Sequence, residues 1–215
     1  RVRVENLWLR GQVSMPLGRG EAGLNAVEKA AEIARRHGWR VDVGHALLVK
    51  ARILRDRGHY EEALGVLDEA YDELDACDDT IGLMFAEFGR GLIRLRLGDF
   101  AEAREYWLVA LRLARQCEHH TLEPQILSFV GYAWFCEGRY GKAASYLERS
   151  LSAAERIGDG IAIASSTRHL GEIARYQQRW DEARSWYQRA LEAERNRGQH
   201  GRNQYLDELN LALVD

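Results

Sequence analysis

Hydrophobic and polar positions follow a pattern along this chain that returns every forty residues. Four stretches each run from a polar turn through an aromatic residue into an amphipathic segment with regularly spaced alanines: "RGHYEEALGVLDEA", "LGDFAEAREYWLVA", "EGRYGKAASYLERS" and "QQRWDEARSWYQRA". Upstream of each turn, a small residue stands at an equivalent place: Ala51, Gly91, Gly131 and Gly171. Each repeat therefore predicts a helix, a tight turn and a second helix.

The recurring residues have simple physical roles in such a helical hairpin. Gly58, Gly98 and Gly138 permit the reversal of the backbone at the turn, which other residues resist. The aromatic residue that follows fills the wedge between the two helices, and the small residues allow close packing. One hairpin cannot bury its apolar face alone, so neighbouring hairpins must stack on one another.

The period divides the chain into a single array of units. We expect a partial unit at 1–40, full units at about 41–80, 81–120, 121–160 and 161–200, and a final helix at about 202–215. Because the array begins and ends inside a repeat, we expect this chain to come from a longer polypeptide.

Composition and net charge argue against several classes of function. Net charge is −3 and the basic residues form no stripe with interleaved aromatics, which argues against nucleic-acid binding. No apolar run reaches the ~18 residues that a membrane helix needs. Three cysteines without framework spacing are typical of reduced thiols in the cytoplasm.

Motifs for catalysis are not found in the sequence. It contains no P-loop, no dinucleotide-binding glycine pattern, no nucleophile elbow and no zinc-type His/Glu helix. The nearest metal-like group, "CEHH" from Cys117 to His120, falls in a turn between two units. Carboxylate pairs such as Glu61–Glu62 fall in first turns of helices, where they complement the helix dipole. We therefore expect no catalytic residue, no cofactor and no metal.

The pattern resembles the tetratricopeptide repeat. The best matches are "LSFVGYAWFCEGRYGKAASYLERSL" and "TRHLGEIARYQQRWDEARSWYQRAL". Its long period is similar to that of sensor arrays in bacterial signal-transduction ATPase regulators and of spindle-orientation adaptors. The resemblance implies an all-α, right-handed superhelical solenoid of antiparallel hairpins that binds a protein or peptide.

In that family the first helices line a concave groove for the ligand, and the resemblance places eleven residues there. They are Arg52 and Arg55; Phe88, Leu92 and Arg96; Phe129, Tyr132 and Phe135; and Arg168, Arg175 and Tyr176. An apolar centre with arginines at the ends suits a peptide with an apolar middle and acidic flanks. Reversing the charge of Arg168 and Arg175 is expected to weaken binding and leave helicity intact.

The register of the helix from Phe85 to Leu97 has two interpretations. Strict forty-residue spacing turns Glu87, Arg90 and Arg94 toward the packed side, which is costly unless they form ion pairs. A shift of two residues would instead bury Phe85, Phe88 and Leu92. Strict spacing is slightly favoured, because "LRLGDF" contains no residue that would absorb the shift.

Three functions are consistent with the sequence. The first is a non-enzymatic, peptide-binding sensor or scaffold within a larger regulatory protein. The second is the regulatory arm of a kinase, protease or ATPase whose catalytic domain lies outside this chain. The third is self-assembly through the final helix, where Leu206, Leu209 and Leu213 would be exposed.

Overall fold

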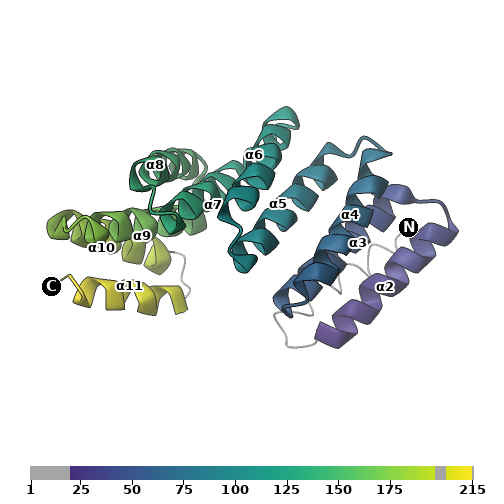
Figure 1. Ribbon diagram of the computed structural model, residues 1–215, viewed down its shortest axis with the longest axis horizontal. Helices are drawn as coiled ribbons and strands as arrows, with labels where there is room; N and C mark the ends of the chain where they lie inside the picture. Colours follow the sequence, from purple (N-terminus) through teal and green to yellow (C-terminus); the bar gives the residue numbers. More distant parts are fainter. Residues whose placement is uncertain (1–19, 197–201, 215) are drawn as a thin grey trace. The chain divides into compact units, whose positions relative to one another are not determined.

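Helices account for the regular structure in the part of the chain that the computed structural model describes, residues 20–196 and 202–214. Ten helices lie in these ranges (Figure 1). They are α2 (Gly20–Arg36), α3 (Arg40–Asp56), α4 (Tyr60–Asp75), α5 (Thr80–Leu97), α6 (Phe100–Gln116), α7 (Glu123–Cys136), α8 (Tyr140–Ile157), α9 (Gly160–Tyr176), α10 (Trp180–Asn196) and α11 (Arg202–Ala212). The segment predicted as the start of the partial first unit, 1–19, lies outside the described residues.

The helices form two compact units, Arg1–Cys117 and Glu118–Asp215. In the first unit α3 pairs with α4 and α5 with α6, and α2 packs against α3. In the second unit α7 pairs with α8 and α9 with α10, and α11 packs against α10. Consecutive helices run antiparallel within each unit (Figure 1), which confirms the predicted all-α fold of helical pairs.

The four turns inside the pairs share one geometry. In each turn a backbone N–H bonds back across it, from His59 to Leu54, Asp99 to Arg94, Arg139 to Trp134 and Arg179 to Ala174, at 2.9–3.0 Å. The residue before each donor has a positive φ, and it is glycine in three turns and Gln178, with φ of 59°, in the fourth. The predicted role of Gly58, Gly98 and Gly138 as turn residues is therefore confirmed.

Two aspartates join neighbouring first helices. Asp79 and Asp159 precede α5 and α9, and each accepts a hydrogen bond from the first turn of that helix. Their remaining oxygens lie 2.8 Å from His45 Nε2 on α3 and 3.4 Å from Gln125 Nε2 on α7. One carboxylate thus caps a helix and bonds to the preceding first helix.

The small residues upstream of the turns accommodate large side chains of the paired helix. Gly91 faces Trp107, Gly131 faces Leu147, and Gly171 faces the ring of Tyr187. A Cβ at Gly131 or Gly171 would lie 2.7 Å from that partner. The alanines of the second helices, such as Ala63, Ala103, Ala143 and Ala183, are completely buried. Close approach of the paired helices therefore explains the recurrence of small residues.

Two glycine substitutions test this packing. Gly171→Ala places a methyl group against the Tyr187 ring, and we expect it to lower the free energy of unfolding by about 1–3 kcal/mol. Gly141→Ala is the matched control, because a Cβ there has no atom within 4 Å. It should be neutral or stabilise by up to about 1 kcal/mol. Urea denaturation measures both, and equal midpoints would contradict the packing described.

Candidate functional site

The residues predicted to bind a ligand fall in both units, and each unit has a set of its own. The α3–α5 face comprises Leu48, Arg52 and Arg55 of α3 with Phe85, Phe88, Leu92, Leu95 and Arg96 of α5. The α7–α9 face comprises Phe129, Tyr132 and Phe135 of α7 with Arg168, His169, Arg175 and Tyr176 of α9. In each unit the two first helices pack against each other, so each face is continuous across two helices.

The α5 helix has the strict forty-residue register. Gly91 is buried against Trp107, whose Nε1 donates to the Phe88 carbonyl at 3.3 Å, while Phe85 remains 38% exposed. The alternative, in which Phe85, Phe88 and Leu92 are all buried, is therefore wrong. Phe88, Leu92 and Leu95 are half-buried and Arg96 is exposed, so their side chains border the surface of the unit.

Ion pairs make this register possible. Arg90 donates to Glu87 at 2.5 Å and to Asp68 of α4 at 2.7 Å, and its guanidinium lies 4.7 Å from the centre of the Tyr71 ring. Arg94 pairs with Glu102 of α6 at 2.9 Å. The charged residues that strict spacing turns inward are thus compensated, as the prediction required.

Aromatic side chains cluster on the α7–α9 face. Tyr176, at the end of α9, is 55% exposed and lies against Phe135 and Tyr140, with ring centres 5.6 and 5.9 Å away. The ring centre of Tyr132 lies 6.2 Å from that of Phe135 and 4.7 Å from that of His169. The family resemblance placed Tyr132, Phe135 and Tyr176 in one groove, and the structure brings their rings together. Tyr140 was predicted only as a residue between two helices, and His169 was not predicted as a site residue.

The two arginines of α9 are held by carboxylates of the same unit. Arg168 donates to both oxygens of Asp207 on α11, at 2.5 and 2.8 Å, and to Glu194 of α10 at 3.2 Å. Asp207 is completely buried and Glu194 nearly so. Reversing the charge of Arg168 therefore disrupts the packing of α11, and that substitution is not a clean test of ligand binding.

Arg175 belongs to a second network. It donates to Glu172 at 2.6 Å, and the hydroxyl of Tyr187 donates to the other Glu172 oxygen at 2.9 Å. The hydrogen bond to Glu172 raises the pKa of Arg175. Its guanidinium also lies 4.8 Å from the centre of the Tyr176 ring, where a cation–π contact supports the position of that ring.

His169 is a neutral group within this face. Burial, with a smaller contribution from the positive charge of Arg168, lowers the pKa of its imidazole to about 4. Its Nδ1 atom is buried and has no hydrogen-bond partner within the described part of the chain. The imidazole therefore contributes an uncharged ring at pH 7, tilted against the ring of Tyr132.

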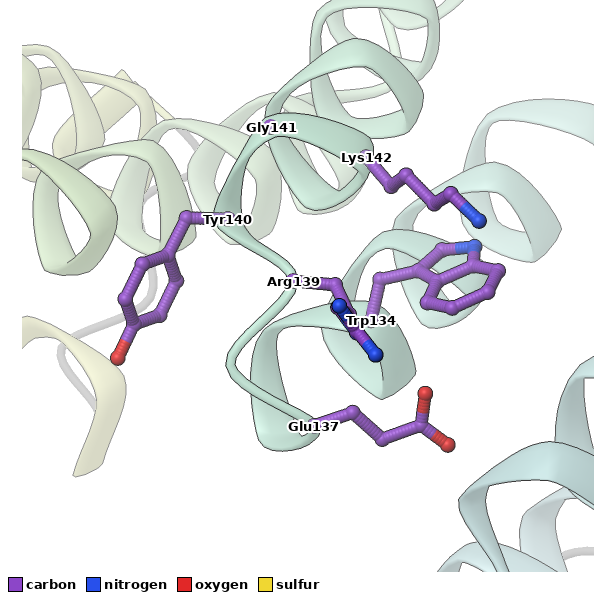
Figure 2. A pocket seen from close by; sticks show the side chains of 6 residues that line it. All are labelled: Trp134, Glu137, Arg139, Tyr140, Gly141 and Lys142. Carbon is purple, nitrogen blue, oxygen red and sulfur yellow. The ribbon is translucent and has the colours of Figure 1, made fainter.

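An open hollow of about 530 Å³ lies at the turn between α7 and α8, and sequence reasoning gave no signal for it. Figure 2 shows the side chains that line it, with Tyr140 directed away from Trp134 and Lys142. Lys142 Nζ lies 4.2 Å from the centre of the Trp134 ring. Arg139 and Lys142 supply positive charge and Glu137 supplies negative charge, so the lining carries both signs.

The cysteine and histidine motif from Cys117 to His120 forms the turn between α6 and α7, and Cys117 Sγ lies 3.6 Å from the Ala114 carbonyl oxygen. Burial raises the pKa of the Cys136 thiol, which disfavours the thiolate at neutral pH. Over residues 20–196 and 202–214, we find no group of three or more His, Cys, Asp or Glu side chains arranged to hold a metal ion. Within the same ranges, no helix is both long enough and apolar enough to cross a membrane.

With the fold and these faces described, the chain is defined as a helical-repeat protein with a tetratricopeptide-like fold. Residues 122–196 match the family model of the tetratricopeptide repeat, which covers α7 to α10 of the second unit. No curated protein matches the sequence.

Solved structures share the fold at low sequence identity. The apo form of RapI is similar with a TM-score of 0.74 and 14% identity, over 99% of this chain and 81% of that chain. BtubC (BKLC) from P. vanneervenii gives a TM-score of 0.76 and 18% identity, over 91% of this chain and 82% of that chain. A Rap protein complexed with competence and sporulation factor gives 0.73 and 18%, over 98% of this chain but only 63% of that chain.

Proposed function

We propose that this chain is a non-enzymatic module that binds a protein or peptide on its first-helix faces, as the sensor or scaffold region of a larger regulatory protein. The tetratricopeptide match supports a binding role, because modules of this kind bind proteins and peptides. The solved Rap complex with competence and sporulation factor has a similar fold and supports the sensor role. A cytoplasmic location and a resemblance to arrays of signalling ATPases are parts of the same proposal.

The observation that carries the proposal is the exposed aromatic cluster of the α7–α9 face. Tyr176 keeps 55% of its surface exposed, although Phe135 and Tyr140 lie within contact distance and Arg175 covers its ring from one side. Large aromatic side chains held rigidly at a surface are the residues that most often dominate binding energy at protein interfaces. We therefore assign Tyr176, Phe135 and Tyr132 to the contact with apolar side chains of the ligand.

Substitution of Tyr176 tests this assignment. A peptide selected for binding to the intact chain from a displayed random library is titrated against purified variants by calorimetry. Tyr176→Ala removes an exposed ring and is expected to weaken binding by about tenfold or more, since truncated aromatic hot spots cost roughly 2 kcal/mol. Tyr176→Phe retains the ring and should bind nearly as the unaltered chain does.

The matched control is Tyr205→Ala, which removes an even more exposed tyrosine from α11 of the same unit. It should leave the affinity unchanged. Equal affinities of the Tyr176→Ala and Tyr205→Ala variants would refute the placement of the ligand on the α7–α9 face, and a library that yields no binding peptide would refute the proposed function itself.

Self-assembly is a second candidate function, favoured by one observation. Leu206, Leu209 and Leu213 of the C-terminal segment are exposed, with 37%, 44% and 60% of their surfaces accessible. They lie on one stripe of α11 and its following turn, at the spacing of successive helical turns. A regulatory role beside a catalytic domain outside this chain is compatible with either candidate, since both need only a binding surface here.

A further inference from the structure

The arginines of the α7–α9 face are already bonded to carboxylates of their own unit. Arg168 donates to Asp207 and Glu194, and Arg175 donates to Glu172. A ligand carboxylate would have to displace one of these partners, and it would lose its own hydration on approach. The face therefore favours a ligand that brings no charge to it.

An uncharged imidazole adjoins the aromatic rings of this face. It belongs to His169, next to the Tyr132 ring, and it is neutral at pH 7 because burial lowers its pKa to about 4. Glu137 and Arg139, at the nearby turn, line the hollow, and Figure 2 shows the Tyr140 ring directed away from them. The rings of the aromatic cluster thus present an uncharged surface.

Three of these rings contact one another and form a platform. The ring centres of Phe135, Tyr140 and Tyr176 lie 5.6–5.9 Å apart, and the planes of Tyr140 and Tyr176 are 20° from parallel. Rings at this separation are in contact, so no ligand side chain fits between them. A ligand must therefore lie across the outer surface of the platform, where Tyr176 keeps 55% of its surface exposed.

Proline suits an uncharged aromatic platform of this kind. Its pyrrolidine ring is compact and apolar, and its fixed φ angle keeps a proline-rich segment extended as a polyproline II helix before it binds. Less conformational entropy is then lost on binding than with a flexible segment. The backbone carbonyls of such a helix form no internal hydrogen bonds, so they can accept hydrogen bonds from tyrosine hydroxyls.

We propose that the aromatic cluster of the α7–α9 face binds an uncharged, proline-rich segment of a partner protein, with proline rings on Tyr140 and Tyr176 and backbone carbonyls facing the tyrosine hydroxyls. Domains of other folds recognise such segments in grooves lined by aromatic side chains. The inference rests on the proposed function and deepens it by naming the class of partner.

Capped synthetic peptides separate the effect of proline from that of charge. They are a proline decamer, the same decamer with alanine at alternate positions, and the same decamer with a glutamate at each end, and each is titrated into the ¹⁵N-labelled intact chain. We expect the proline decamer to shift amide signals of α7 and α9 around Tyr176 and to bind about tenfold more tightly than the alanine peptide. The glutamate peptide should bind no more tightly than the proline decamer.

Variants of the chain locate the proline decamer. Tyr176→Ala should weaken its binding by about tenfold, and Tyr176→Phe, which lacks only the hydroxyl, by at most about threefold. The control Tyr205→Ala removes an exposed tyrosine from α11 and should leave the affinity unchanged. Far-UV circular dichroism confirms that each variant is folded.

No shift with the proline decamer, equal affinity of the alanine peptide, tighter binding of the glutamate peptide, or an unchanged affinity of the Tyr176→Ala variant would each overturn the inference. The proposed function would survive any of these results if a library-selected peptide without proline still bound the α7–α9 face.

Discussion

Arg168→Met is expected to lower the free energy of unfolding by about 3–5 kcal/mol, the range found when one member of a buried ion pair is removed. Arg168 is the cation between Asp207 of α11 and Glu194 of α10, and both carboxylates are buried. Without it, two negative charges remain close together away from water, and α11 loses its charged link to α9. Urea denaturation followed by circular dichroism measures the loss.

Two further variants separate the ion pair from simple packing. Arg168→Met combined with Asp207→Leu and Glu194→Met replaces the whole network by apolar side chains, and it should recover most of the lost stability. Arg189→Met is the matched surface control, since Arg189 pairs with Glu155 where both side chains are about half exposed. It should cost less than about 1 kcal/mol. A loss that small for Arg168→Met would contradict the buried network.

Acidification is expected to destabilise the chain through His169. The pKa of this imidazole is about 4 in the folded chain, against an ordinary value of 6.5, because burial and the charge of Arg168 disfavour the protonated form. The unfolded chain therefore binds the proton more readily between these values. The contribution of the neutral His169 to the free energy of unfolding is fully present above pH 6.5 and is lost as the pH falls toward 4. At roughly 1.4 kcal/mol per pKa unit, this amounts to about 3 kcal/mol.

The measurement compares the free energy of unfolding at pH 7 and pH 4.5 for the unaltered chain and for His169→Gln, which cannot titrate. All other titratable residues are the same in both proteins, so the difference between the two losses isolates His169. The unaltered chain should lose about 2–3 kcal/mol more than the variant. Parallel losses would show that His169 is not held neutral by its surroundings.

The helical pairs could be predicted from the sequence because their causes are local and repeated. A glycine at the turn and a small residue facing a large one are needed in every unit, so the same residue types return at the same spacing. Gly91, Gly131 and Gly171 were found in this way, and each meets the large side chain of its paired helix. Secondary structure and hairpin packing follow directly from such columns.

The ion-pair partners of the charged residues could not be predicted in this way. The resemblance to the tetratricopeptide repeat placed Arg168 at a ligand-binding position, but its partner Asp207 lies 39 residues away on a helix outside the periodic core. Similarly, the register of α5 depends on Asp68 of α4, which receives a hydrogen bond from Arg90. Tertiary packing decides which arginine pairs with which carboxylate. A repeat pattern predicts the helix face on which a residue lies, but it does not predict the side-chain rotamer.

Aromatic clustering was predicted in part. Tyr132, Phe135 and Tyr176 share a face by their spacing, and their rings do come together. Tyr140 joins them from the start of α8, because the turn brings the first residue of the second helix beside the last turn of the first. The repeat pattern assigns Tyr140 a single role, as the residue between two helices. In the structure this side chain also belongs to the exposed aromatic cluster.

The most direct test of the central claim is a map of the amide signals that change when a selected peptide is added to the ¹⁵N-labelled chain. The account predicts changes concentrated on α3, α5, α7 and α9, with Tyr176 among the largest. Changes concentrated on the second helices α4, α6, α8 and α10 would contradict binding on the first-helix faces. Changes confined to α11 that also appear on raising the protein concentration would instead indicate self-assembly.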